Sequence, residues 1–238
     1  MKLCFFGDSI GKGIVYDNEK ERYVPTDNSF LKLVESEENC EIQNFSRYGC
    51  TVTYAEKLVG KNSEKIEASD FVVLEFGGND SDYDWKKIAE DPDAEHNPHT
   101  PISVFVETYK KIINEIKKLG KIPLLLTLPP IDAKKYFNWV SKDTNSDNIL
   151  KWLGGDEVYI YRWHEMYNCA VCDISCATQT PLIDIRSAFL VRPDYSDFLC
   201  EDGIHPNEKG HRLIKSALCS AIGSVLSPAK VSADAFGA

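Results

Sequence analysis

Short apolar runs alternate along the chain with longer segments that carry a helical pattern. The apolar runs cover residues 2–6, 40–45, 70–76, 122–128 and 180–185. These runs are almost continuously hydrophobic, which is typical of parallel strands covered on both faces, whereas strands with one wet face alternate apolar and polar positions. We therefore predict a central, mainly parallel sheet of about five strands.

Amphipathic helices are predicted between the strands. The clearest pattern covers residues 103–120, where apolar side chains recur at helical spacing and Gly120 supplies a C-terminal stop. Residues 29–38 and 207–226 show further helical patterns, and Asn207 is a suitable N-cap for the last one. Strands that alternate with helices predict an α/β fold with right-handed crossovers.

Two connections are longer than is usual between a strand and a helix. Residues 81–101 follow the third predicted strand, and residues 129–167, rich in Tyr and Trp, follow the fourth. The aromatic segment has two interpretations: a lid or platform over a ligand, or a helical subdomain that buries its rings against the core or a second subunit. With no internal repeat, residues 1–226 are interpreted as a single domain with two insertions, and residues 227–238 as a loosely ordered tail.

Charge and composition exclude some classes of partner. The 238 residues are 43% hydrophobic and carry a formal net charge of -10, which argues against a general binder of nucleic acid or anionic membranes. The opening apolar run is too short for a secretion signal or a membrane span. A chain of this size does not need disulfides, so the eight cysteines are interpreted mostly as free thiols in a reducing cytoplasm.

Three cysteines lie close together in the stretch "CAVCDISC". Cys169, Cys172 and Cys176 have a spacing that could hold a metal if a fourth ligand came from elsewhere. The same spacing places them on one stripe of a helix, where they would pack as small apolar residues. We favour the packing interpretation, because the second cysteine pair of a usual zinc site is missing.

Chemically useful residues follow several of the predicted strands. Ser9 follows the first strand, Gly49 the second and Asn79 the third, while Asp202 and His205 lie after the fifth strand and before the last helix. The carboxyl ends of parallel strands meet at one edge of a sheet, where ligands bind in folds of this class. The residues are therefore predicted to share one site although they are distant in the sequence.

Ser9, His205 and Asp202 have the functional groups of a nucleophilic site. A serine hydroxyl is a weak nucleophile until an imidazole takes its proton, and a carboxylate can hold that imidazole in the required tautomer. Asp202 can reach back to His205 across a turn at Gly203, and Pro206 biases His205 away from helical geometry.

A serine nucleophile also needs donors for the oxyanion that forms during acyl transfer. The backbone N–H groups of Ser9 and Gly49 and the side-chain amide of Asn79 are the candidates. A glycine in such a loop lets the backbone come close to a ligand.

Four short stretches, "FGDSIG", "NFSRYG", "FGGND" and "DGIHPN", resemble, in order, the four sequence blocks of the SGNH (GDSL-type) esterase and lipase family. The resemblance implies a flavodoxin-like three-layer α/β/α fold and ester hydrolysis through an acyl-enzyme, with no metal or organic cofactor. It also implies a role for each matched residue: Ser9 as nucleophile and backbone donor, Gly49 and Asn79 as oxyanion donors, and Asp202 and His205 as the other members of the triad.

The histidines and the acid next to the nucleophile receive separate interpretations. Asp8 is expected to brace the loop, and His211 is interpreted as a surface or packing residue. His96, His99 and His164 are open to a role as substrate contacts, although loop histidines are most often simply solvated.

The favoured hypothesis is a serine esterase that acts on a short acyl ester, such as an O-acetyl group on a carbohydrate or a small molecule. A lysolipid or thioester hydrolase, or an acyltransferase, could use the same residues. A protein that has lost the chemistry and only binds ligands on this fold is the hypothesis from another class. The sequence leaves open whether the chain forms a homo-oligomer.

Overall fold

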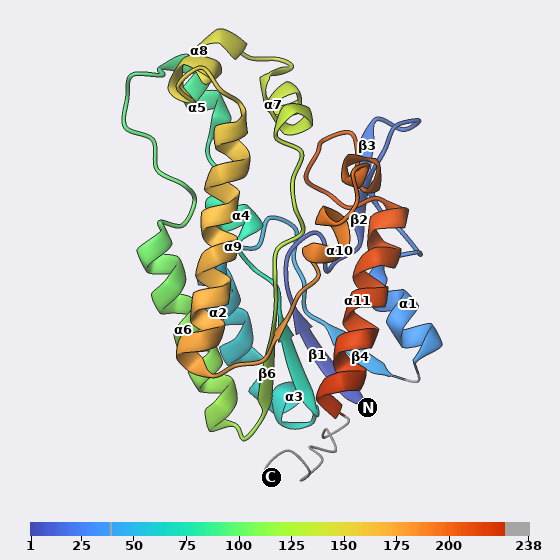
Figure 1. Cartoon of the computed structure of the whole chain (residues 1–238). Coiled ribbons are helices and arrows are strands. Elements are labelled where there is room, and N and C mark those ends of the chain that lie inside the picture. Colours follow the sequence, from blue (N-terminus) through green and yellow to red (C-terminus); the bar gives the residue numbers. More distant parts are fainter. Residues whose placement is uncertain (39, 227–238) are drawn as a thin grey trace, which may run out of the picture.

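A five-stranded parallel sheet forms the centre of residues 1–38 and 40–226, which are the part of the chain that the computed structural model describes; side chains of the last helix are described through Ala221. The strand order is β4-β1-β5-β6-β7 (Figure 1). The strands are β1 (Lys2–Phe6), β4 (Glu41–Asn44), β5 (Phe71–Leu74), β6 (Ile122–Leu126) and β7 (Leu182–Ile183). The predicted sheet is confirmed. The predicted tail, residues 227–238, lies outside the described residues.

Helices cover both faces of the sheet, as Figure 1 shows. One face carries α2 (Val52–Lys61), α6 (Ile102–Lys118) and α9 (Val158–Thr178), and the other carries α1 (Phe30–Glu37) and α11 (Glu208–Leu226). Shorter elements complete the layers: α3 (Ser63–Glu67), α4 (Gly78–Ser81), α10 (Ser187–Leu190) and the 3-10 turn η1 (Tyr195–Phe198). This is the three-layer α/β/α arrangement. No helix in the described ranges is long and apolar enough to cross a lipid bilayer.

β1, β5 and β6 are almost continuously hydrophobic because both of their faces are buried, whereas the edge strand β4 is mostly polar and has no buried residue. Cys4 and Phe6 of β1 belong to the core cluster under α2, α6 and α9, whereas Leu3 and Phe5 belong to the cluster under α1 and α11. Successive side chains of a strand point to opposite faces, so each core takes alternate residues. Burying a Phe or Leu side chain stabilises the fold by about 1.5–3 kcal/mol.

The strand order reverses at β1. The chain passes from β1 outward to β4, and then returns to the other side of β1 to form β5. The loops that leave β1 and β5 therefore diverge, which opens a crevice at the carboxyl edge between these two strands. Ser9 follows β1, and Asn79 lies in α4 just after β5, so the topology places both residues at this crevice.

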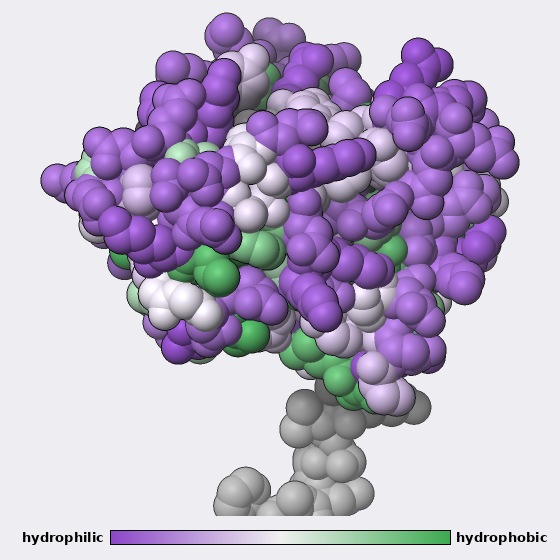
Figure 2. Space-filling view, turned by 90° about the horizontal axis from the view of Figure 1, so that it is seen from above, coloured by the Kyte–Doolittle hydropathy of each residue, from purple (hydrophilic) through white to green (hydrophobic). Residues whose placement is uncertain are grey.

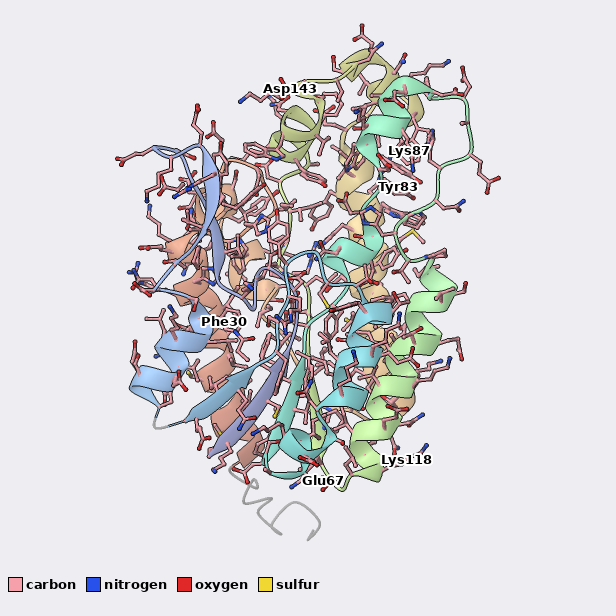
Figure 3. The ribbon with its side chains drawn as sticks, turned by 180° about the vertical axis from the view of Figure 1, so that it is seen from behind. Phe30, Glu67, Tyr83, Lys87, Lys118 and Asp143 are labelled. Carbon is pink, nitrogen blue, oxygen red and sulfur yellow. The ribbon has the colours of Figure 1, made fainter. Side chains whose placement is uncertain are left out.

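The two long connections pack together above the carboxyl edge of the sheet, and we call residues 81–101 and 129–167 the cap (Figure 1). The cap contains α5 (Trp85–Glu90), α7 (Ala133–Ser141), α8 (Ser146–Trp152) and the first half of α9. Its side chains form their own hydrophobic cluster, which includes Tyr83 and Trp85. Figure 3 shows Lys87 and Asp143 at the end of the cap farthest from the sheet, with Tyr83 nearer to it.

A two-stranded antiparallel hairpin, which the sequence analysis did not predict, lies across the site from the cap (Figure 1). It consists of β2 (Ile14–Asp17) and β3 (Arg22–Pro25). The N–H of Ile14 donates to the carbonyl oxygen of Ser9 at 2.9 Å, so the hairpin begins directly at the loop after β1.

The cysteine stretch is helical, but its predicted packing is wrong. Cys169 and Cys176 are exposed on α9, and Cys172 is partly exposed. The core side of α9 is formed instead by other residues, among them Val171 and Ile174. Helical spacing identified the stripe but not the direction in which it faces. No group of three His, Cys, Asp or Glu side chains within residues 1–38 and 40–226 is arranged to hold a metal ion.

Candidate active site

Ser9, His205 and Asp202 form a continuous chain of hydrogen bonds. Nε2 of His205 lies 2.8 Å from Oγ of Ser9, and Nδ1 of the same ring lies 2.6 Å from Oδ2 of Asp202. All three side chains are buried. The parallel sheet thus brings together residues from opposite ends of the sequence, at the edge where the strand order predicted a site.

The Asp202 carboxylate is held by donors of its own loop. Its Oδ1 accepts from the backbone N–H groups of Ile204 at 3.0 Å and His205 at 3.1 Å, in addition to the ring contact at Oδ2. Burial acts to raise the pKa of Asp202, but the hydrogen bond and charge of His205 and the two backbone donors outweigh it and hold this pKa below its ordinary value. The carboxylate is therefore ionised at neutral pH.

The loop that carries Asp202 and His205 is closed on itself. The N–H of Cys200 donates to the carbonyl oxygen of His205 at 2.7 Å, across a bridge between Leu199 and Pro206. Gly203 turns the loop with φ +75°, a conformation that glycine adopts without strain. The predicted N-cap of α11 is confirmed, because Oδ1 of Asn207 accepts from two backbone N–H groups of the first turn.

Asn79 is oriented by Asp8, the acid that precedes Ser9. Its Nδ2 donates to Oδ2 of Asp8 at 2.8 Å, while Oδ1 of Asp8 accepts from the N–H of Ile10 at 2.8 Å. Asp8 therefore braces the loop, as its position predicted. One amide hydrogen of Asn79 remains for a ligand, and Asn79 lines the cavity described below.

The two backbone donors differ in how they relate to the cavity. The N–H groups of Ser9 and Gly49 donate to no acceptor within the described ranges. Ser9 lines the cavity, but Gly49 does not; its neighbour Tyr48 does, with its ring 6.5 Å from that of His205. Gly49 has φ +66°, so the loop turns sharply there.

The sequence matches the model of a known protein family. Residues 5–213 match the model of the GDSL-like Lipase/Acylhydrolase family. The chain belongs to this family. The matched range includes all five predicted site residues of this GDSL-like chain, from Ser9 to His205.

Solved structures of GDSL-like type share the fold. A lipase/acylhydrolase from Enterococcus faecalis has a TM-score of 0.66 and 21% identity, with 94% of this chain and 96% of that chain covered. A catalytic mutant of Axe2, an acetylxylan esterase from Geobacillus stearothermophilus, has a TM-score of 0.64 and 21% identity, with 93% and 94% covered. This similarity supports the flavodoxin-like three-layer arrangement.

Two plant relatives are similar in sequence. The GDSL esterase/lipase WDL1 of Oryza sativa subsp. japonica is 23% identical over 148 residues, which are 60% of this chain and 49% of the relative. The GDSL esterase/lipase CPRD49 of Arabidopsis thaliana is 22% identical over 161 residues, which are 63% and 53%. The chain spans about half the length of these curated relatives.

A cavity of about 380 Å³ extends from Ser9 and His205 into the cap of this GDSL-like fold. Figure 2 looks down from above and shows hydrophilic side chains at the periphery, with paler residues towards the middle. The cap contributes most of the aromatic lining: Tyr83, Trp85, Tyr136, Trp139, Trp152, Tyr159 and Trp163. The cap rings thus pack against each other and also line the cavity, with Tyr83, Trp85 and Tyr136 buried and Trp139, Trp152 and Trp163 partly exposed, so the two interpretations of the aromatic segment do not exclude each other.

A buried acid that the sequence analysis missed lies beside Asp8. Glu75 follows β5 and lines the cavity, and its side chain is 1% exposed. Neither carboxyl oxygen has a hydrogen-bond partner that meets standard geometry within the described residues. Burial, followed by the negative charge of Asp8, raises the pKa of Glu75 well above its ordinary value. Burial also raises the pKa of Asp8. The pair therefore retains a proton to higher pH than ordinary carboxyls do.

One of the histidines left open faces the cavity. His164 of α9 lines it and is buried, and burial together with the charge of Arg186 lowers the pKa of His164 to about 3. The imidazole is therefore neutral at physiological pH. Its Nδ1 has no hydrogen-bond partner among the described residues, so the ring has free hydrogen-bonding capacity.

The remaining histidines are not part of the cavity lining. Nδ1 of His99 contacts the carbonyl oxygen of Asn79 at 3.0 Å, and the ring of His96 packs against Trp152. His211 is fully buried and stacks on Phe30, so of its two interpretations the packing one is confirmed.

Proposed function

We propose that this protein is a carboxylic ester hydrolase that works through a covalent acyl-enzyme. The observation that carries the proposal is the hydrogen-bond chain from Asp202 through His205 to Ser9, with Ser9 and His205 at the wall of a cavity. These hydrogen bonds hold the imidazole of His205 with Nε2 directed at the hydroxyl of Ser9, which is the arrangement that a serine nucleophile requires.

In the proposed reaction, Oγ of Ser9 attacks the ester carbonyl carbon while Nε2 of His205 takes the hydroxyl proton. The carbonyl oxygen becomes an oxyanion, which the N–H groups of Ser9 and Gly49 and the amide of Asn79 stabilise. The intermediate collapses, and the imidazolium gives its proton to the leaving alcohol. Water then attacks the acyl-enzyme, again with His205 as the base, which releases the acid and restores Ser9.

Asp202 stabilises the imidazolium in both halves of the reaction. Its carboxylate keeps the proton of His205 on Nδ1, so Nε2 is free to accept from Ser9. Because the pKa of Asp202 is held low, the carboxylate stays charged while the proton moves between Ser9 and the leaving group.

For the substrate, we propose a short acyl ester of a carbohydrate or another small molecule. The cavity has room for a small ring beside Ser9, and its aromatic walls can stack on a sugar face. Axe2, one of the similar solved structures, is named as an acetylxylan esterase, which supports the same substrate class.

A longer acyl group is the second candidate, as in a lysolipid or thioester. Aliphatic side chains, among them Leu128, Ile131 and Ile160, share the cavity wall with the aromatic rings. Such a wall would accept a hydrocarbon chain. Transfer of the acyl group to another alcohol would use the same acyl-enzyme, and the acceptor would replace water.

A chain-length series tests the proposal. The p-nitrophenyl esters of acetate, butyrate, octanoate and laurate, together with acetylated xylo-oligosaccharides, are assayed with the wild type and with Ser9→Ala. We expect the highest kcat/KM on acetyl esters and a loss of at least about 10³-fold in Ser9→Ala. Hydrolysis that survives Ser9→Ala would contradict the nucleophile, and a preference for laurate would favour the second candidate.

A further inference from the structure

The hairpin brings a hydroxyl from outside the catalytic loop onto Asp202. The phenol of Tyr23 on β3 donates to Oδ2 of Asp202 at 2.9 Å, and the two residues are 179 positions apart. The same oxygen accepts from Nδ1 of His205. The other hydrogen bonds to this carboxylate come from residues 204 and 205, so within the described ranges Tyr23 is its one donor from another element.

The hairpin is fixed on both sides of the site. At its start, the N–H of Ile14 donates to the carbonyl oxygen of Ser9. The N–H of Tyr16 donates to Sγ of Cys200 at 3.4 Å, and beyond its end Oγ1 of Thr26 donates to Glu208 at the start of α11 at 2.9 Å. The position of Tyr23 is therefore determined by the loops that carry the nucleophile and the acid.

The ring of Tyr23 also covers the imidazole. Its centroid lies 5.1 Å from that of His205, and the rings of Tyr48 and Trp139 lie 6.0 Å and 6.1 Å from Tyr23. These rings reduce the access of water to the hydrogen bond between His205 and Asp202, and an interaction in such surroundings is stronger than one in water. Burial, followed by the charge of Asp202, raises the pKa of Tyr23, so its phenol remains a donor in the neutral range.

A second donor on Oδ2 changes the strength of the acid's interaction with the imidazole. The phenol draws negative charge from the oxygen that faces His205, so the carboxylate attracts the imidazolium less strongly. The same bond restricts rotation of the carboxylate. Asp8 and His211 also interact electrostatically with His205, and Tyr23→Phe leaves both of these groups in place.

We propose that Tyr23 is a positioning residue for the proposed hydrolysis, on which this inference rests: its hydroxyl fixes the Asp202 carboxylate that faces His205 and moderates the charge on Oδ2 of that carboxylate. The hydroxyl of Tyr23 acts on His205 through Asp202.

The test compares Tyr23→Phe with Tyr16→Phe, which removes the hydroxyl of the neighbouring hairpin ring, a group not bonded to Asp202. In Tyr23→Phe we expect the acid limb of the kcat/KM profile to move up by about half a pH unit. We expect kcat at the optimum to fall about 3–10-fold, a loss within the range of the net contribution of one hydrogen bond, with little change in KM. Tyr16→Phe should match the wild type. A lower kcat with an unmoved acid limb would reduce Tyr23 to a structural residue and overturn the proposal.

A second measurement does not depend on turnover. The ring Cε1–H resonance of His205, identified by its absence in His205→Gln, is followed by NMR against pH in the wild type and in Tyr23→Phe. We expect the midpoint to move upward by about half a pH unit in the variant. An unmoved midpoint would overturn the inference even if the protein is an esterase. A wild type that hydrolyses no ester would instead contradict the proposed function and leave this comparison valid.

Discussion

Nδ2 of Asn79 donates to Oδ2 of Asp8 at 2.8 Å, so the residue before the proposed nucleophile orients one of the proposed oxyanion donors. Asn79→Ala removes the donor and should lower kcat by about 10²–10³-fold, because an oxyanion donor acts mainly in the transition state. Asp8→Ala leaves the amide in place but releases it, and should cost a smaller factor. Steady-state kinetics on p-nitrophenyl acetate measure both losses.

One result would contradict the prediction that Asn79 stabilises the oxyanion. A change in KM without a change in kcat for Asn79→Ala would mean that the amide binds the ground state as strongly as the transition state. Circular dichroism would establish that both variants keep the fold, since Asp8 also accepts from the N–H of Ile10.

Relative to the wild type, Glu75→Gln should have a higher free energy of unfolding at neutral pH than at acid pH. The folded-state pKa of Glu75 is raised well above its ordinary value, so its contribution is full below the unfolded pKa of about 4.3 and is lost as pH rises towards the folded one. Gln does not titrate. The free energy of unfolding of Glu75→Gln minus that of the wild type should therefore rise with pH, by up to about 1.4 kcal/mol per pH unit.

Urea unfolding at pH 4.5 and pH 7 measures this difference. Glu67→Gln is the matched control, because Glu67 is exposed on α3, and its curve should run parallel to that of the wild type. A parallel curve for Glu75→Gln as well would contradict the retention of a proton by the buried pair.

Gly203→Ala should impair both stability and turnover. A Cβ at this position would lie 2.7 Å from the carbonyl oxygen of Asp132 and 2.9 Å from the backbone nitrogen of Tyr136, and φ is +75°. The substitution would push the loop that carries Asp202 and His205 away from the start of α7. Gly154→Ala is the control, since Gly154 has the same φ of +75° but nothing within 4 Å of the added carbon.

Measurements of thermal unfolding and of kcat for Gly203→Ala and Gly154→Ala separate the strain of the left-handed backbone from the contact with α7. Gly154→Ala should cost about 1–2 kcal/mol from the left-handed backbone alone and leave kcat unchanged. Gly203→Ala should cost more and lower kcat. Equal losses of stability for the two variants, with kcat intact, would mean that the contact with α7 has no role at the site.

His211 should make the protein less stable as pH falls. Burial, followed by the nearby His205, lowers its folded-state pKa to about 4, below the unfolded value of about 6.5. The unfolded state therefore binds the proton first, and stability falls between these two pH values. His211→Asn keeps an acceptor for the N–H of Phe30 but does not titrate, so its stability should fall less steeply from pH 6.5 to pH 4 in chemical unfolding. Identical slopes would contradict a neutral buried ring.

The sheet and the residues at its edge could be predicted because each has a local signal. Parallel strands buried on both faces are continuously apolar, and a residue that follows such a strand lies at the carboxyl edge whatever its position in the sequence. These two regularities were sufficient to place Ser9 near His205, and in the structure Oγ of Ser9 and Nε2 of His205 lie 2.8 Å apart.

Tyr23 and Glu75 were missed because their environment depends on distant parts of the chain. Tyr23 lies in a strand of only four residues, and the acid to which it donates is 179 positions away. Glu75 lies inside the apolar run 70–76, where one acidic residue does not alter the pattern for a strand. The exposed cysteines show the same limit, since helical periodicity gives their spacing but not the face that meets the core.

The hydrogen bond between Ser9 and His205 joins positions 196 residues apart, and this fixes when activity can arise during folding. Contacts of such long sequence separation form only after much chain entropy has been lost. β1 must pair with both β4 and β5, and the loop before α11 must be in place, before Oγ and Nε2 meet. Ester hydrolysis would therefore report completed folding of this chain, and a collapsed intermediate with native helices but an unformed sheet would be inactive.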